Sequence, residues 1–205
     1  MNSTKKKIDV HWLTGTAILS AVAFLLMFVE FPIPMLMPSF IKMDVSDLPA
    51  LLGAFAFGPA SGIVIELLKN LLHILIKGTT SACIGELSNF LLGCCMVVPA
   101  ALIYYGKKTR KRAIIGSLVG CAAMAVCSLP INYFIVYPAY VKFYGLPLDA
   151  IIGMYQAINP HVNGLFICLL IFNVPFTFFK GLLDAVICYF IYKPLSPVLH
   201  GRKKA

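Results

Sequence analysis

Four polar side chains recur at helical spacing inside an apolar stretch near the C-terminal end of the sequence. Asn173, Thr177, Lys180 and Asp184 are four, three and four residues apart, so a helix places them on one face. Amide, hydroxyl and ammonium groups on one face can donate hydrogen bonds to a bound polar solute. A structural alternative pairs Lys180 with Asp184 one turn away, so that both hold helices together. Ionisable residues in apolar stretches favour a functional role, and both interpretations can hold at once.

Two other apolar stretches carry polar residues that can lie at a similar depth. Asn132 and Tyr133 stand towards the end of one stretch, and another begins with Gly85, Glu86 and Asn89. An amide such as Asn132 is costly in an apolar setting unless it is hydrogen-bonded, which favours a binding role. Glu86 and Asn89 have a simpler alternative as polar residues at a helix end.

A third polar stripe is formed by Glu66, Lys69, Asn70 and His73, at relative positions i, i+3, i+4 and i+7. We interpret it as structural, with Glu66 paired to Lys69, because a metal site requires further His or Cys ligands near His73. The seven cysteines form no CxxC pair and have no His at ligand spacing. Paired carboxylates and an activated nucleophile are also missing, so we predict no metal site, no catalytic residues and no enzyme activity.

The stretches that must position these side chains belong to a strongly hydrophobic chain. Of its 205 residues 60% are hydrophobic and the mean hydropathy is +0.90, values that do not fit a water-facing surface. The first stretch lacks a clear small-residue cleavage site, so it is expected to be a span rather than a signal peptide. The net charge of +9 comes from basic clusters without interleaved aromatics, which argues against nucleic-acid binding.

Runs of roughly 20 apolar residues bounded by charge, Pro or Gly predict membrane-spanning helices. Six such stretches emerge, at residues 12–29, 48–57, 60–76, 87–105, 113–137 and 164–192. The second is short by itself and ends at the turn formed by Gly58 and Pro59. We therefore predict an all-α integral membrane protein with six transmembrane helices, in which residues 1–205 form a single domain.

Basic residues predict the orientation of these helices, because short cytoplasmic segments hold an excess of Lys and Arg. Three clusters contain three, five and four of the 17 basic residues, 12 in total. They are Lys5, Lys6 and Lys7; Lys107, Lys108, Arg110, Lys111 and Arg112; and Lys193, Arg202, Lys203 and Lys204. Six spans place both termini and the connection between the fourth and fifth spans on one side, which we predict to be the cytoplasm.

Three connections are then expected outside, at about residues 30–47, 77–86 and 138–163. The first and third are rich in Pro, so we expect ordered loops that can cap a site. Near the cytoplasmic start of the first span, Ala17 and Ala21 form a small-xxx-small pattern that permits close helix approach. Packing within the chain and contact with a partner are both open for this pattern.

Four segments together carry a resemblance to a known family. They are FIKMDVSDLPALLGAFAFGPASGIVIELLKNLLH (40–73), GELSNFLLG (85–93), LPINYF (129–134) and NVPFTFFKGLLDA (173–185). On these motifs the chain resembles, over nearly its whole length, the riboflavin-specific S-components (RibU type) of energy-coupling factor (ECF) vitamin transporters. The resemblance implies a multi-pass subunit of the bacterial plasma membrane that is surrounded by lipid and captures riboflavin from outside. It also implies a transmembrane T-component and two cytoplasmic ATPase subunits as partners, with riboflavin as the transported ligand and no cofactor.

The resemblance also implies roles for individual residues. Asn132, Thr177 and Lys180 are expected at the polar edge of the isoalloxazine ring, although the family usually has Asn at the position of Thr177. Ala17 and Ala21 are expected on the surface that meets the T-component. The remaining candidates for ligand binding, through the ribityl hydroxyls or the wall around the ring, are Asp44, Asp47, Gly85, Glu86, Asn89, Tyr133 and Asn173.

Alternatives remain for the ligand and for the class of protein. The same architecture can serve FMN or another vitamin. A structural membrane subunit without a transport role is a second alternative, but it leaves the costly polar face of the last span without a use.

Overall fold

The structure, a computed structural model, describes residues 10–79 and 81–199. Its longer helices are α1 (Val10–Met27), α2 (Leu48–Phe57), α3 (Pro59–Lys77), α4 (Ile84–Gly106), α5 (Arg110–Ile131) and α9 (Val174–Leu199). Shorter elements are β1 (Phe31–Pro32), β2 (Lys42–Met43), η1 (Asn132–Val136), α6 (Tyr137–Ala139), η2 (Tyr140–Tyr144), α7 (Leu148–Gln156), α8 (Leu165–Cys168) and η3 (Leu169–Asn173). The three η elements are π-helical turns that continue neighbouring α-helices.

The all-α membrane class is confirmed, but the predicted second span differs from the other five. Within the described residues, five helical segments are long and apolar enough to cross a membrane, and α2 is not among them. At ten residues α2 is about 15 Å long, half of a typical hydrocarbon core. It packs against α1, α3, α4 and α9, and all but its last residue are buried. Of the six predicted spans, five are therefore long enough to cross a membrane, and the second, already noted as short, is the shorter apolar helix α2.

Because α2 is short, the segment that precedes it enters the bundle as non-helical chain. Asp44, Ser46 and Asp47 are buried, and Asp47 contacts Lys69 in the middle of α3. Non-helical backbone at membrane depth is tolerated where it is buried in protein, which is the situation here. The prediction of a wholly external connection at residues 30–47 is corrected accordingly, because its last part lies inside.

The predicted end of the fifth span at Tyr137 was also too early. The helical segment Arg110–Phe143 is continuous, and the Tyr137 N–H donates to the Asn132 carbonyl across η1. Such π-helical turns accommodate Pro138, which lacks an N–H and otherwise ends or kinks a helix. The connection that follows contains the helix α7, where only a loop was predicted.

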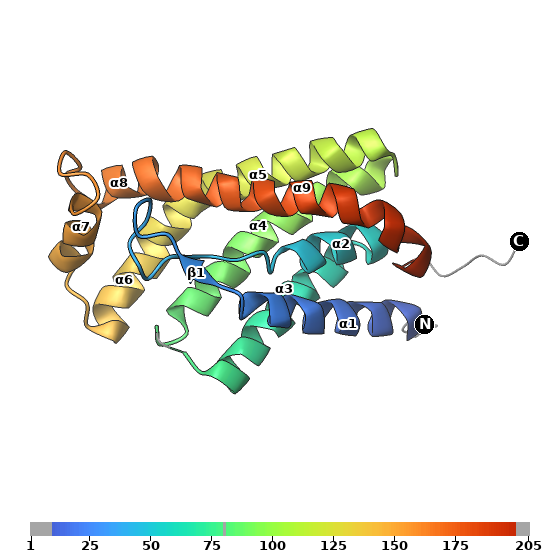
Figure 1. Cartoon of the computed structure of the whole chain (residues 1–205), viewed down its shortest axis with the longest axis horizontal. Helices are drawn as coiled ribbons and strands as arrows, with labels where there is room; N and C mark the ends of the chain where they lie inside the picture. The colour runs from blue at the N-terminus through green and yellow to red at the C-terminus, as the bar shows by residue number, and fades with distance from the viewer. Residues whose placement is uncertain (1–9, 80, 200–205) are drawn as a thin grey trace, which may run out of the picture.

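The two ends of the bundle differ in their connections. The start of α1, the end of α9 and the hairpin between α4 and α5 lie at one end, whereas β1 and α7 lie at the other (Figure 1). This arrangement agrees with the predicted grouping of basic clusters on one side. Lys5, Lys6, Lys7, Arg202, Lys203 and Lys204 lie outside the described residues.

The α4–α5 hairpin depends on two glycines that let the helix backbones touch. A Cβ atom on Gly116 would lie 2.6 Å from the carbonyl oxygen of Ala100, and one on Gly120 would lie 2.4 Å from that of Met96. Backbone cannot move aside as a flexible side chain can. The prediction from sequence missed the small-xxx-small pattern of Gly116 and Gly120.

We expect Gly120→Ala to destabilise the protein by about 1–3 kcal/mol, because the added methyl group separates α4 from α5. Thermal unfolding in detergent measures the change. Gly153→Ala in α7 is the matched control, since its Cβ meets nothing within 4 Å. That control should be neutral or up to about 1 kcal/mol more stable. Equal melting temperatures for the two variants would contradict the predicted clash.

Candidate ligand-binding site

A cavity of about 360 Å³ opens among the first connection, α3, α4, α5 with η1, α7 and α9. Its size lies within the range of small-molecule sites. Eight of the predicted binding residues line it: Asp44, Gly85, Glu86, Asn89, Asn132, Asn173, Thr177 and Lys180. Four separate parts of the chain therefore contribute polar side chains to one space.

Lys180 forms the charged floor of this cavity. Its Nζ atom lies 3.2 Å from Oδ2 of Asp44 and 3.0 Å from Oδ2 of Asp47, and its side chain is almost completely buried. The structural alternative that pairs Lys180 with Asp184 is not found, since no ion pair joins them and the two carboxylates of the first connection pair with Lys180 instead. Those carboxylates reach Lys180 because residues 44–47 enter the bundle.

Asp47 is shared between two lysines and does not line the cavity. Its Oδ1 atom accepts a hydrogen bond from Lys69, which also lies 2.8 Å from Oε2 of Glu66 and donates to Oγ of Ser46 at 3.0 Å. The predicted pair of Glu66 and Lys69 is confirmed. The bond between Lys69 and Asp47 was missed, because nothing in the sequence relates residues 22 positions apart across a turn.

Asn132 and Thr177 line the cavity from two different helices. Asn132 lies where α5 passes into η1, and Thr177 lies one turn above Lys180 on α9. Both are buried and line the cavity together with Met124 and Phe176. The deep part of the cavity therefore combines an amide, a hydroxyl and an ammonium group with an apolar wall.

Asn173 is held by two tyrosines from separate elements. The Tyr155 hydroxyl of α7 donates to Oδ1 of Asn173 at 2.6 Å and lies 2.5 Å from the Tyr137 hydroxyl. Burial raises the pKa of Tyr155, so this hydroxyl stays protonated. These contacts anchor α7 and set Ile151 into the cavity wall.

Sequence reasoning missed α7 and Tyr155. A signal was present, because Leu148, Ile151, Ile152 and Tyr155 are spaced as on one face of a helix.

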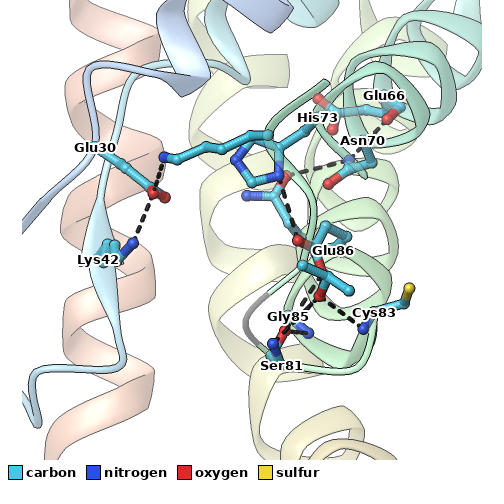
Figure 2. A network of polar contacts seen from close by, with 12 residues as sticks. Glu30, Lys42, Glu66, Asn70, His73, Ser81, Cys83, Gly85 and Glu86 are labelled. Atoms are coloured by element: carbon cyan, nitrogen blue, oxygen red, sulfur yellow. Dashed lines mark hydrogen bonds and ion pairs between the residues drawn. The ribbon is translucent and has the colours of Figure 1, made fainter. Parts of the chain in front are cut away.

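Glu86 lies at the outer part of the cavity in a polar network with α3 (Figure 2). Its Oε2 atom accepts hydrogen bonds from Thr79 at 3.1 Å and Ser81 at 3.4 Å, and its Oε1 atom lies 3.3 Å from Nδ1 of His73. Ser81 also accepts from the Gly85 N–H at 3.0 Å, which satisfies the start of α4. Glu86 is therefore a cavity residue rather than the cap of its helix.

Asn89 lies one turn further along α4, and Asn70 of α3 donates to its Oδ1 atom at 3.4 Å. Asn89 and Asn70 thereby connect α3 to the cavity wall.

The first connection is fastened across the outer end by Glu30. This carboxylate accepts from Lys42 of β2 at 2.6 Å (Figure 2) and also from Lys77 of α3 at 2.5 Å. Partial burial alone would raise the pKa of Glu30, but the two ammonium groups outweigh it and lower the pKa. Glu30 thus stays ionised and holds the β1–β2 hairpin against α3.

Tyr133 and the two alanines lie away from the cavity. Tyr133 is 38% exposed and packs edge-on against Phe134 and Phe166. Adjacent helical residues point about 100° apart, so Tyr133 faces outward when Asn132 faces inward. The assignment of Tyr133 to the ligand wall is corrected. Ala17 and Ala21 are exposed on the outer face of α1, so they do not pack within the chain.

Metal-ligating residues are not clustered in the part of the chain that the structure describes, where no group of three or more His, Cys, Asp or Glu side chains could hold an ion. The cavity itself combines polar groups with an apolar wall, as sites for small organic molecules do.

Comparison with known proteins agrees with this geometry. The family model of the ECF transporter substrate-specific component matches residues 11–192. This chain belongs to that family. A solved S component of a bacterial ECF transporter has the same fold, with a TM-score of 0.70 and 31% sequence identity over 92% of this chain and 96% of that one. Family membership and the five apolar segments make the chain a multi-pass protein of the bacterial plasma membrane.

Several curated relatives of this S component cover it almost end to end. The riboflavin transporter FmnP of Bacillus subtilis (strain 168) is 30% identical, over 97% of this chain and 98% of the relative. The riboflavin transporter RibU of Staphylococcus aureus (strain TCH60) is 33% identical over 89% of each chain. RibU of Streptococcus thermophilus (strain ATCC BAA-250 / LMG 18311) is 35% identical, over 97% of this chain and 86% of the relative.

We expect Lys69→Met to cost about 3–5 kcal/mol of stability, because it leaves Glu66 without its counter-ion and Asp47 with one lysine in place of two. Thermal unfolding of the ligand-free protein in detergent provides the measurement. Lys142→Met is the control, since Lys142 is exposed and a surface substitution changes stability by only about 0.5 kcal/mol. If both variants melt together, the buried ion pairs do not anchor the segment before α2.

Proposed function

We propose that this S component binds riboflavin from outside the cell and presents it for ATP-driven uptake by partner subunits. The single observation that carries the proposal is the polar floor of the cavity, where Asn132, Thr177 and Lys180 converge on one space. Relatives at 30–35% identity named as riboflavin transporters support the choice of ligand.

The chemistry of the cavity floor matches the acceptor-rich edge of an isoalloxazine ring. An ammonium group has three N–H donors, and Asp44 and Asp47 engage two of those of Lys180. The third is free to donate to a flavin carbonyl. Asn132 adds an amide, which can donate and accept at once, and Thr177 adds a hydroxyl. Three polar groups of different kinds can therefore form hydrogen bonds with one edge of the ring.

The upper part of the cavity suits the body and tail of the same ligand. Aromatic side chains of Phe40, Tyr137, Tyr140 and Phe176 line the wall, where they can enclose a flat ring. The ribityl hydroxyls would then lie near Glu86 and Asn89, at the outer end of α4. In this proposal Asp47 holds Lys180 in place rather than touching the ligand.

The outer end of the cavity favours riboflavin over FMN. Lys42 and Lys77 line the cavity and both pair with Glu30, and the carboxylate of Glu86 lines the same cavity. Glu30 and Glu86 together balance the charge of these two lysines, so a phosphate at the end of the tail would add negative charge that no surplus cation among the described lining residues offsets.

Purified protein should bind riboflavin and quench its fluorescence, and Lys180→Met and Asn132→Ala should each weaken binding about 10- to 100-fold. The physical reason is the loss of a donor to the flavin edge. Titration of flavin fluorescence measures the affinity. Lys142→Met and Tyr133→Ala are the matched controls, because both residues lie away from the cavity and should leave Kd unchanged.

Absence of flavin binding by the unsubstituted protein would refute the riboflavin proposal. Equal affinity for FMN and riboflavin would remove the role given to Glu86.

Partner assembly forms the second part of the proposal. We propose that the exposed stripe of Ala17 and Ala21 on α1 meets the transmembrane T-component, which in turn carries two cytoplasmic ATPase subunits. Small side chains on an exposed helix face allow another helix to approach closely within a bilayer. Larger exposed residues, Leu13, Ile18 and Leu25, lie close to the two alanines in the sequence, so Ala17 and Ala21 are the small side chains of an exposed apolar helix face.

Ala17→Phe should prevent assembly with the T-component, because the ring keeps a partner helix from approaching α1 closely, while riboflavin binding by the isolated subunit stays unchanged. Co-purification of the subunits from co-expressing cells measures assembly. Ile18→Phe is the control, since it enlarges an already exposed apolar side chain on the neighbouring stripe. Normal recovery of the complex with Ala17→Phe would place the partner surface elsewhere.

A further inference from the structure

Asp184 is the one described acid on α9, and it is completely buried. It lies one turn below Lys180, and neither of its carboxylate oxygens has a hydrogen-bond partner among the described residues. An ionised carboxylate without donors in an apolar interior costs several kcal/mol, and such a group neutralises instead. Nothing in the proposed contacts with riboflavin uses this side chain.

Among the described residues, the groups around Asp184 offer it no free counter-ion. Lys180, on its own helix, is turned towards Asp44 and Asp47 of the first connection. Lys69 of α3 is engaged by Asp47 and Glu66. The other titratable neighbours are two thiols, which carry no positive charge: Cys121 of α5 and Cys188 of α9.

A charge count over the buried cluster leads to the same conclusion. Four carboxylates, those of Asp44, Asp47, Glu66 and Asp184, share two ammonium groups, those of Lys69 and Lys180. Full ionisation would leave two uncompensated negative charges inside the membrane. Since Asp184 is the carboxylate with no ion pair, it is the first to hold a proton.

We propose that Asp184 is a proton-binding site whose occupancy sets the direction of Lys180. With the proton in place, Asp184 is neutral and Lys180 points to the cavity floor, as in the structure. Asp184 is at the i+4 position from Lys180. Without the proton, its carboxylate is charged and competes with Asp44 and Asp47 for the ammonium group of Lys180. Asp184 is thus a positioning residue that acts on the ligand through Lys180.

The sign of the pH dependence follows from this arrangement and rests on the proposed binding of riboflavin. Asp184 loses its proton as the pH rises, and Lys180 is then drawn away from the flavin edge. Affinity should therefore fall with rising pH. The loss of one charged hydrogen bond corresponds to a decrease of about tenfold or more.

Asp184→Asn tests the proposal, because the amide has nearly the same shape as the protonated acid and cannot ionise. Riboflavin affinity of each protein is measured by fluorescence titration from neutral to alkaline pH. The unsubstituted protein should lose about tenfold more affinity over this range than the Asp184→Asn variant. Ionisation of the flavin itself affects both proteins equally. Asp149→Asn, at an exposed aspartate on α7, should behave as the unsubstituted protein.

Infrared spectroscopy supplies a second measurement that needs no ligand. At neutral pH the protein should show the C=O stretching band of buried carboxylic acid, and Asp184→Asn should remove the part of that band that Asp184 contributes. If Asp184→Asn does not fold, Glu66→Gln removes the other candidate acid, and the band should persist in it. Parallel pH profiles with and without Asp184, or no acid band in Glu66→Gln, would overturn the proposal.

The two proposals fail in different ways. If the unsubstituted protein does not bind riboflavin at any pH, the proposed ligand is wrong, and the infrared band alone then decides whether Asp184 holds a proton.

Discussion

Buried ion pairs around Asp47 are the contacts on which the rest of this S component depends. Asp47 lies between Lys69 of α3 and Lys180 of α9, and it stands at the start of α2. A helix of ten residues cannot cross a bilayer, so the chain before it must lie at membrane depth without helical hydrogen bonds. Lys69 of α3 and Lys180 of α9 hold this segment in place through their ion pairs with Asp47. Removing one partner of a buried ion pair leaves an uncompensated charge, so none of these charged residues can be replaced alone without a large loss of stability.

The same ion pairs build the floor of the cavity. Lys180 is held by Asp44 and Asp47 from one side, and its remaining N–H can point into the open space above. A lysine held in this way loses little rotamer freedom when a ligand arrives, which lowers the entropic cost of binding. Fold and recognition are therefore coupled through one ammonium group. The neutral state of Asp184 belongs to the same balance, because it keeps that ammonium group directed upward.

Local periodicity explains how much of this could be predicted. The polar stripe of α9, the pair of Glu66 and Lys69, and the bounds of most helices depend on neighbours within one or two turns. The contacts missed at Asp44, Asp47 and Tyr155 join residues far apart in the sequence, and their depth depends on where the chain re-enters the bundle. The assignment of Tyr133 to the ligand wall was wrong for a different reason. It was chosen because it follows Asn132, but its side chain lies on the exposed side of the helix and packs against Phe134 and Phe166.

The strength of the contacts around the cavity decreases from its floor to its outer end. The pairs of Lys69 and Lys180 are buried, whereas Lys42 and Lys77 are 38% and 35% exposed where they meet Glu30. Solvent-exposed ion pairs contribute about 1 kcal/mol or less, and salt screens them further. Separating the β1–β2 hairpin from α3 therefore costs far less than moving residues 44–47. A solute arriving from outside meets the weakest contacts first, and the side chains that bind it are fixed by the strongest ones.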